Sequence, residues 1–200
     1  MKVSRLVLAS QSPRRRELLK LLGHPFECIP SDIEEHAVPG EAPAGHVTRL
    51  SEMKARSTGG TLTDAIVIGS DTIVVLDGDI LEKPASEHEA VDMLMHLSNR
   101  THTVYTGFAL LDTSSGRTVS GHETSRVTMR DFSRSLAERY VKTGEPLDKA
   151  GAYGIQGYGA VLITGIEGCF FNVMGLPLAR LMETLHDFSD GRFGYFGLTG

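Results

Sequence analysis

The segment Ser10-Gln11-Ser12-Pro13-Arg14-Arg15-Arg16 combines a predicted helix start with a cluster of arginines. Ser12 and Pro13 are typical of the cap and the first position of a helix. Free N–H groups at a helix start attract anions, and guanidinium groups match phosphate oxygens in pairs. A capped surface helix would carry the same residues, although arginines at the positive end of a helix are mildly unfavourable without an anion. The segment is therefore compatible with a polyphosphate cradle or with a capped, solvated helix start.

A second polar group, Gly69-Ser70-Asp71-Thr72, interrupts an apolar run, and Lys83 follows it after a short turn at Asp77 and Gly78. A carboxylate near a lysine can serve as a metal ligand or as a general base for water that attacks phosphorus. An isolated aspartate more commonly accepts hydrogen bonds from the backbone of a turn. Because Lys83 precedes a proline, its backbone favours an extended form, and we expect its side chain to point toward the same cleft as Asp71.

A third segment, from Gly144 to Gly157, is a long loop rich in glycine and polar residues. Loops of this length are usually functional or disordered, and Tyr153 with Ile155 argues against disorder, so we expect a binding loop. The amide of Gln156 both donates and accepts hydrogen bonds, which would match the adjacent N3–H and O4 of uracil or thymine. The alternative is that this amide caps nearby backbone.

A short acidic run contains Asp32, Glu34 and Glu35. Such carboxylates can hold Mg²⁺ or Mn²⁺ through their oxygens, although a solvated charged surface is the more common explanation. The histidines do not form the paired helical zinc motif, and the chain has neither a GxxxxGK[ST] phosphate loop nor a serine-hydrolase elbow. Zinc proteases, P-loop enzymes and serine hydrolases are therefore not supported.

The elements that must position these groups alternate between strands and helices, which is typical of an α/β protein. We predict strands over 5–9, 65–76, 102–111, 118–129, 161–164 and 170–173, and helices over 12–22, 44–57, 86–97, 134–141 and 177–186. Lys54 falls on the second of these helices, and Ser86 with Glu89 is a capping box that opens the third.

The composition favours one globular domain over residues 1–187, because 200 residues with 40% hydrophobic content can bury one sizeable core. The Gly- and aromatic-rich tail, 188–200, shows no period, and we expect it to be mobile or docked on a partner. A net charge of −5 argues against nucleic-acid binding. The apolar runs are too short to span a membrane and no secretory signal is visible, so we expect a cytoplasmic protein.

Several of these motifs together resemble the Maf family, the septum-formation-inhibitor-like nucleotide pyrophosphatases, from about Leu6 to about Leu185. The matching blocks are Leu8-Ala9-Ser10, Ser12-Pro13-Arg14-Arg15, Glu17-Leu18-Leu19, Lys54-Ala55, Gly69-Ser70-Asp71-Thr72, Lys83-Pro84, Asp148 to Gly157, and Val173 to Pro177. The resemblance implies an elongated mixed β-sheet flanked by helices with a deep cleft between two lobes, and commonly a homodimer.

The resemblance also implies roles for single residues in cleavage between the α and β phosphates of a nucleoside triphosphate. Asp71 would accept a proton from the attacking water, and Glu35 would support the metal or the water. Lys54 and Lys83, which belong to the catalytic set, would hold the triphosphate together with Ser10 and Arg15. A divalent cation, Mg²⁺ or Mn²⁺, would be bound with the help of Glu35 and Asp71.

Base choice would depend on Arg14, Thr72 and Gln156, which resemble the dTTP/UTP branch of the family. The branch similar to 7-methyl-GTP pyrophosphatases has an aromatic residue, a glutamine and a glutamate at these positions. Two alternatives stay open from the sequence. One is a nucleotide-sensing regulator of cell division, and the other is a pyrophosphatase for modified or purine nucleotides.

Overall fold

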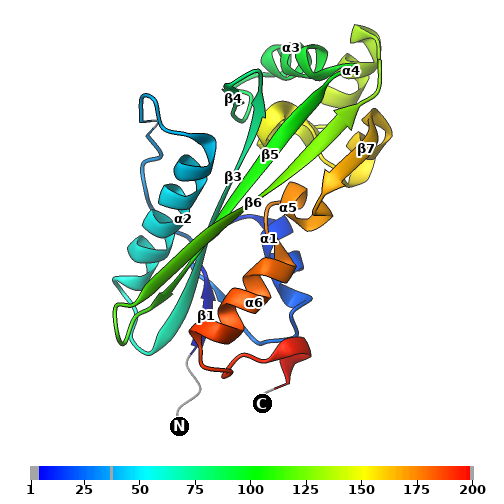
Figure 1. Ribbon diagram of the computed structural model, residues 1–200. Helices are drawn as coiled ribbons and strands as arrows, with labels where there is room; N and C mark the ends of the chain where they lie inside the picture. The colour runs from blue at the N-terminus through cyan, green and yellow to red at the C-terminus, as the bar shows by residue number, and fades with distance from the viewer. Residues whose placement is uncertain (1–4, 37, 199–200) are drawn as a thin grey trace. The chain divides into compact units, whose positions relative to one another are not determined.

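A computed structural model describes residues 5–36 and 38–198, and the described chain forms a mixed seven-stranded β-sheet with helices on its faces (Figure 1). The strand order is β2-β1-β3-β5-β6-β7, and β4 pairs with β3. The strands are β1 (Arg5–Leu8), β2 (Glu27–Cys28), β3 (Ala65–Leu76), β4 (Asp79–Leu81), β5 (Thr101–Asp112), β6 (Thr118–Met129) and β7 (Ile163–Gly168). The predicted α/β class with a mixed sheet is confirmed.

Helices connect most of these strands. The α-helices are α1 (Pro13–Lys20), α2 (Pro43–Gly59), α3 (Glu87–Leu97), α4 (Arg134–Val141), α5 (Phe170–Met174) and α6 (Leu178–Phe188). The 3₁₀ helices are η1 (Glu145–Asp148), η2 (Ala150–Ala152), η3 (Gly157–Leu162) and η4 (Tyr195–Gly197). Among the described residues, none of these helices combines the length and apolar character needed to cross a membrane.

The chain folds as two compact units, each assembled from separate segments. Unit 1 consists of the described residues of 1–71, 106–123 and 175–200, and unit 2 consists of 72–105 and 124–174. The expectation of a single domain over 1–187 followed by a tail stays a prediction.

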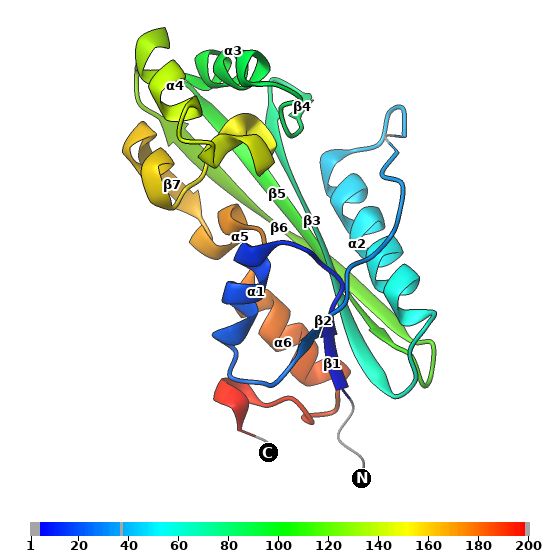
Figure 2. The same ribbon diagram turned by 180° about the vertical axis from the view of Figure 1, so that it is seen from behind.

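In unit 1, the parallel strands β1 and β3 are buried on both faces. Val7 is in register with Val67, and both belong to a cluster of buried side chains that includes Ala55 of α2. Leu8 and Ile68, in register on the alternate positions, are also fully buried. Helix α2 covers one face of this part of the sheet, while α1 and α6 cover the other (Figures 1 and 2). Burial on both faces explains why these strands are nearly continuous apolar runs.

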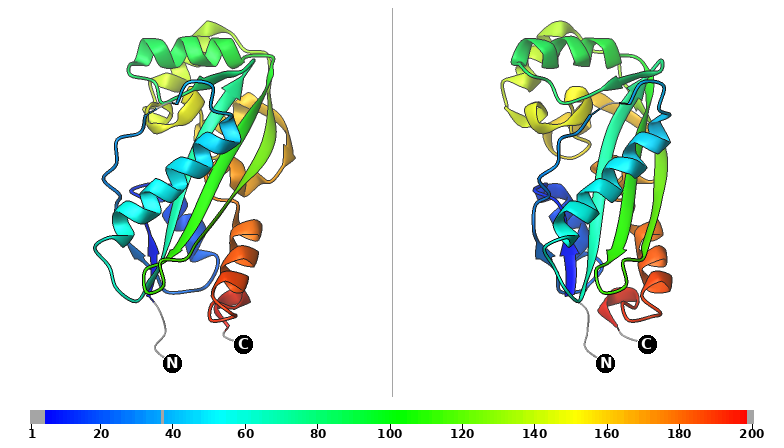
Figure 3. Two further views of the ribbon diagram at one scale, coloured as in Figure 1. Left: turned by 60° about the vertical axis from the view of Figure 1, so that its left-hand side comes forward. Right: turned by 90° about the vertical axis from the view of Figure 1, so that its left-hand side faces the viewer.

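Helix α2 lies across strands of unit 1 (Figure 3), and two glycines of these strands are in close contact with it. A Cβ atom at Gly69 of β3 would come within 2.0 Å of the Ser51 carbonyl oxygen. A Cβ atom at Gly107 of β5 would come within 2.3 Å of the Val47 carbonyl oxygen. Because no side chain fits at either crossing, the helix backbone can approach the sheet backbone closely.

In unit 2, strands β3 and β4 form a hairpin whose two-residue turn is Asp77 and Gly78. Leu76 pairs with Asp79, and both turn residues have positive φ, 54° for Asp77 and 97° for Gly78. This geometry is that of the favoured hairpin turns, which require positive φ at both central positions. The turn predicted from the sequence is confirmed.

Three predictions for the C-terminal half are wrong in part. Phe170 to Val173 was expected to be a strand but belongs to helix α5, whose turn brings Asn172 inward to donate from Nδ2 to the Val104 carbonyl at 3.1 Å. Strand β7 begins only at Ile163, because the two preceding residues belong to η3. The glycine-rich segment is not an open loop, since η1, η2 and the start of η3 order most of it.

The described residues after α6 pack in part against the rest of unit 1. Phe193 is 4% exposed, and its ring meets the imidazole of His24 edge to face. His24 Nε2 lies 2.6 Å from the Gly194 carbonyl oxygen. Phe196 and Leu198, further along, are largely exposed.

Replacing Gly69 with alanine tests the close crossing of α2 over β3. The new methyl group would overlap the Ser51 carbonyl, so we expect Gly69→Ala to lower the free energy of unfolding by about 3 kcal/mol or more in urea titrations. Gly45→Ala is the control, because Gly45 lies on an exposed part of α2 with its nearest neighbouring atom at 3.6 Å. That variant should be neutral or more stable by about 0.5–1 kcal/mol. Equal stability of the two variants would contradict the crossing.

Candidate active site

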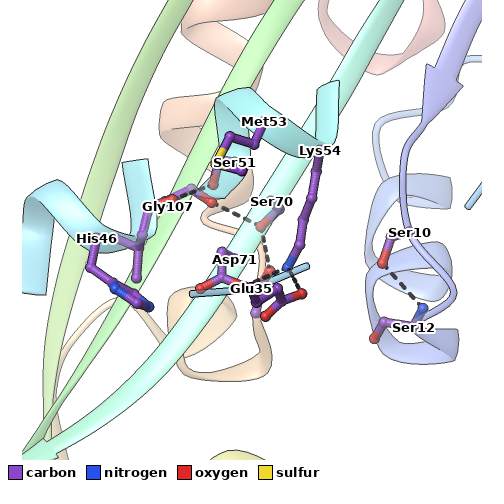
Figure 4. Close-up of polar contacts among 12 residues, drawn as sticks. Ser10, Ser12, Glu35, His46, Ser51, Met53, Lys54, Ser70, Asp71 and Gly107 are labelled. Carbon is purple, nitrogen blue, oxygen red and sulfur yellow. Dashed lines mark hydrogen bonds and ion pairs between the residues drawn. The ribbon is translucent and has the colours of Figure 1, made fainter. Parts of the chain in front are cut away.

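The centre of the candidate site in unit 1 is the ammonium group of Lys54. Its Nζ donates to Asp71 Oδ1 at 2.6 Å and forms an ion pair with Glu35 Oε1 at 2.8 Å (Figure 4). The side chains of Lys54 and Asp71 are 10% and 8% exposed, whereas Glu35 is 51% exposed. Two carboxylates therefore share one largely buried cation, and one of them reaches solvent.

Neighbouring backbone positions bring Lys54 and Asp71 together. Lys54 is on the buried side of α2, next to Ala55, whose backbone nitrogen would lie 2.8 Å from a Cβ at Gly69. Asp71 follows Gly69 by two residues on β3, so the close crossing also brings the lysine within reach of the carboxylate. Asp71, inside this apolar strand, thus accepts from a lysine of α2 and not from the backbone of a turn.

Ser70, the other buried polar residue of this strand, is fully buried and faces two carbonyl groups. Its Oγ lies 2.9 Å from the Gly107 oxygen and 3.1 Å from the Gly175 oxygen, and the hydroxyl can donate to either. Arg15 Nε donates to the same Gly175 oxygen at 2.9 Å. Gly175, which has φ of 110°, therefore links the first turn of α1 to the strand that carries Asp71.

The charges around Asp71 act on two arginines. Burial lowers the pKa of Arg15, the carboxylates of Asp71 and Glu35 oppose that effect, and the neighbouring Arg14 adds to it. The pKa of Arg49 is raised, first by its hydrogen bonds to Glu41 and, more weakly, by the charge of Asp71. Asp71 is therefore surrounded by positive charge from Lys54, Arg15 and Arg49, an environment suited to polyphosphate.

The start of α1 presents the predicted helix cap. Ser12 Oγ accepts from the Arg15 backbone N–H at 3.4 Å, and Ser10 Oγ accepts from the Ser12 N–H at 3.1 Å. The first turn of α1 contains no acidic residue. Arg14 and Arg15 are half-buried and Arg16 is exposed. The predicted cap is confirmed, and the positive helix end has no carboxylate of its own in that turn.

Helix α2 also holds the segment that carries Glu35. Arg49 donates to the His36 carbonyl at 3.0 Å, next to Glu35, and Ser57 Oγ donates to the Asp32 carbonyl at 3.3 Å. Arg49 is itself fixed by a bidentate pair with Glu41, at 2.7 Å from each of two guanidinium nitrogens. The acidic run is therefore not a purely solvated surface, because its backbone is tied to the helix that carries Lys54.

The remaining predicted residues belong to unit 2. Thr72 directly follows Asp71 on β3 and is half-buried, while Lys83 and Gln156 are exposed. In the same unit, Tyr153 of the glycine-rich segment is buried and its hydroxyl lies 2.7 Å from His102 Nε2. Burial lowers the pKa of His102 to about 4, so this buried imidazole is neutral at ordinary pH. The participation of Lys83 and Gln156 in one site with Asp71 stays a prediction.

The carboxylates of Glu35 and Asp71 are the groups of this site that could contribute to a divalent metal. In the described part of the chain, no group of three or more His, Cys, Asp or Glu side chains could hold a metal ion. Glu35 and Asp71 nevertheless converge on one cationic point, at 2.8 and 2.6 Å from Lys54 Nζ. Mg²⁺ is commonly bound through one or two carboxylates together with water and substrate phosphates.

A family model described as "Maf-like protein" matches residues 5–188, which extend from the start of β1 to the end of α6. The chain belongs to the Maf family. The resemblance expected from the short motifs is confirmed, and the match includes segments of both units of this Maf chain.

Relatives of this Maf protein share about half of its residues over nearly the whole chain. A protein of Moorella thermoacetica named dTTP/UTP pyrophosphatase is 53% identical over 183 residues, which cover 92% of this chain and 94% of the relative. A protein of the same name from Pelotomaculum thermopropionicum is 48% identical over 95% of this chain and 97% of the relative. One from Bacillus cytotoxicus is 44% identical over 94% and 98% of the two chains.

Sequence reasoning missed the residues that support the site. Ser70 and Gly175 were inside matching motifs but had no role, and the Gly175 carbonyl is a backbone group that no side-chain pattern reveals. Arg49, on the predicted helix over 44–57, had no predicted role, whereas it pairs with Glu41, before the helix start. A bidentate Arg–Glu pair across a helix start has no distinctive spacing in the sequence.

A thermodynamic cycle tests the buried ion pair. Lys54→Met leaves the buried Asp71 carboxylate without its cation, and we expect a loss of about 3–5 kcal/mol in the free energy of unfolding. The double variant Lys54→Met/Asp71→Asn should recover more than about 1 kcal/mol of that loss. Lys20→Met is the control, because its pair with Glu17 is exposed and should contribute less than about 1 kcal/mol. Equal effects of Lys54→Met and Lys20→Met would contradict this account.

Proposed function

We propose that this Maf protein hydrolyses dTTP and UTP to the nucleoside monophosphate and pyrophosphate. The observation that carries the proposal is the buried cluster of Lys54, Asp71 and Glu35 in a chain 53% identical to a protein named dTTP/UTP pyrophosphatase. The cluster supplies a carboxylate for proton transfer next to a cation that can bind phosphate. Hydrolysis of a nucleoside triphosphate uses both kinds of group.

Asp71 is the proton acceptor for the attacking water in this proposal. An incoming triphosphate competes with Asp71 for Lys54, because phosphate oxygens are strong acceptors for an ammonium group. Loss of that hydrogen bond leaves Asp71 free to accept a proton. Lys54, Lys83, Arg15 and Ser10 hold the phosphates, and Glu35 orients the water or the metal. Glu35 and Asp71 would hold a Mg²⁺ or Mn²⁺ ion, which would supply positive charge opposite the phosphates.

Base preference is assigned to Arg14, Thr72 and Gln156. Gln156 lies in the glycine-rich segment and is exposed, so its amide is available to a ligand. An amide presents a donor and an acceptor side by side, as uracil and thymine do on their N3–H and O4 edge. Cytosine presents a different pattern, with an acceptor at N3 and a donor at N4.

The proposal also includes the oligomeric state, the partners and the location of the protein. The family resemblance supports a homodimer, and the net charge of −5 supports nucleotides and not nucleic acid as partners. A cytoplasmic location without membrane attachment is carried over from the sequence as a prediction.

A triphosphate panel tests the proposed function. The purified protein is incubated with Mg²⁺ or Mn²⁺ and dTTP, UTP, CTP, GTP or 7-methyl-GTP, and pyrophosphate is resolved from orthophosphate. We expect pyrophosphate from dTTP and UTP, none with a chelator, and a loss of about 10²- to 10³-fold in Asp71→Asn. Orthophosphate as the product would indicate a phosphatase, and tight nucleotide binding without turnover would indicate a nucleotide-sensing regulator.

Gln156→Glu tests the base assignment. A carboxylate accepts hydrogen bonds but cannot donate, so it loses one contact to uracil O4 and can instead accept from the N–H groups of a purine. We expect the ratio of kcat/KM for UTP over 7-methyl-GTP to fall by about tenfold or more. An unchanged ranking of substrates in Gln156→Glu would refute the role of Gln156 while leaving the reaction type intact.

A further inference from the structure

The carboxylate of Glu145 is the centre of a hydrogen-bond network inside unit 2. Its Oε1 accepts from the Tyr140 hydroxyl at 2.8 Å and from the Gly159 N–H at 3.0 Å. Its Oε2 accepts from the Tyr158 N–H at 2.9 Å. Both oxygens therefore face donors, and two of the three donors are backbone groups that follow Gln156 in the chain.

The Tyr140 hydroxyl extends the network to the other side of Gln156. It accepts from the Gly154 N–H at 2.9 Å while it donates to Glu145. Gly154 lies two residues before Gln156, and Tyr158 lies two residues after it. The segment 154–159, named here the Gln156 loop, is thus held at both ends by one phenol and one carboxylate.

The glycines of the Gln156 loop leave room for these two side chains. A Cβ atom at Gly157 would lie 2.4 Å from Glu145 Oε2, and Gly157 also has φ of 72°. A Cβ atom at Gly159 would lie 2.3 Å from the Gly154 carbonyl oxygen and 2.6 Å from the Tyr140 hydroxyl, and one at Gly154 would lie 3.0 Å from Glu145 Oε1. These glycines are therefore required in part by contact with Glu145 and Tyr140, and they do not indicate a flexible loop.

Charge strengthens the network. Burial alone would raise the pKa of Glu145, but the N–H groups of Gly159 and Tyr158, the Tyr140 hydroxyl and the charge of Lys149 lower it overall. Burial raises the pKa of Tyr140, so its phenol stays protonated and keeps donating. Hydrogen bonds to an ionised acceptor are about twice as strong as neutral ones.

We propose that Glu145 and Tyr140 are positioning residues that set the base preference by holding the Gln156 loop in one conformation. A single side-chain amide discriminates uracil from cytosine only when its donor and acceptor have fixed positions. A loop that is already ordered also loses less conformational freedom when a nucleotide binds. This inference depends on the proposed function, because it assigns a mechanism to the preference for dTTP and UTP.

Glu145→Gln is the sharpest variant, because it keeps the size of the side chain and removes one acceptor. Its NH₂ group would face at least one of the N–H or O–H donors that now point at the carboxylate. Glu138→Gln is the matched control, since Glu138 is exposed on the neighbouring α4. Tyr140→Phe is the second variant, because it keeps the buried ring and removes only the hydroxyl.

Two readouts are combined: amide hydrogen exchange of 154–159 without nucleotide, and kcat and KM for dTTP, UTP and CTP. In Glu145→Gln we expect about tenfold faster exchange in the Gln156 loop, about tenfold higher KM for UTP, and a UTP-over-CTP preference reduced by about tenfold. The effect on kcat should be smaller than that on KM. Tyr140→Phe should shift the same quantities in the same direction, and Glu138→Gln should shift none of them.

The failures of the two proposals are distinguishable. If the wild type cleaves dTTP and UTP but Glu145→Gln and Tyr140→Phe keep the KM and the UTP-over-CTP ratio of Glu138→Gln, the positioning role is overturned and the function stands. If the wild type produces no pyrophosphate from dTTP or UTP, the proposed function falls and the role in base preference falls with it.

Discussion

The structure of the candidate site depends on one constraint: a largely buried ammonium group must be neutralised by carboxylates that come from other elements. Lys54 meets Asp71 at 2.6 Å and Glu35 at 2.8 Å, and only Glu35 has substantial exposure to solvent. Removing one partner of such a pair leaves an uncompensated buried charge, which is strongly unfavourable. The helix, the strand and the acidic segment that supply these groups are therefore coupled, and a shift of one changes the electrostatics of the others.

That coupling explains residues of unit 1 for which the sequence predicted no catalytic or binding role. Gly69 allows α2 to cross β3 at the distance that Lys54 needs, and Arg49 fixes the backbone beside Glu35. Gly175 receives hydrogen bonds from Arg15 and Ser70, which relates the arginines of α1 to the strand that carries Asp71. Each contact joins a group that could bind phosphate or activate water to a backbone position that the fold determines.

The sequence predicted the helices and strands well where the hydrophobic pattern and the flanking turn or cap residues were clear. The predicted boundaries of β3, β6 and α4 match those of the structure. It failed at Phe170 to Val173, a short apolar run with no period to separate strand from helix, where the buried amide of Asn172 favours a helical turn. For the site, family motifs identified Lys54, Glu35 and Asp71 separately. Their shared ion pair depends on a helix crossing and could not be inferred from spacing, and neither could contacts to backbone carbonyls.

Two carboxylates of this protein, Glu145 and Asp71, have hydrogen-bond partners of different kinds, and the difference bears on the role proposed for Asp71. Glu145 accepts from two backbone N–H groups of the Gln156 loop and from the buried phenol of Tyr140. Asp71 accepts from the end of a lysine side chain, which has rotatable bonds and can turn toward a phosphate without any backbone change. The first arrangement keeps a carboxylate permanently satisfied. The second would allow an anionic substrate to release the carboxylate for the proton transfer proposed for Asp71.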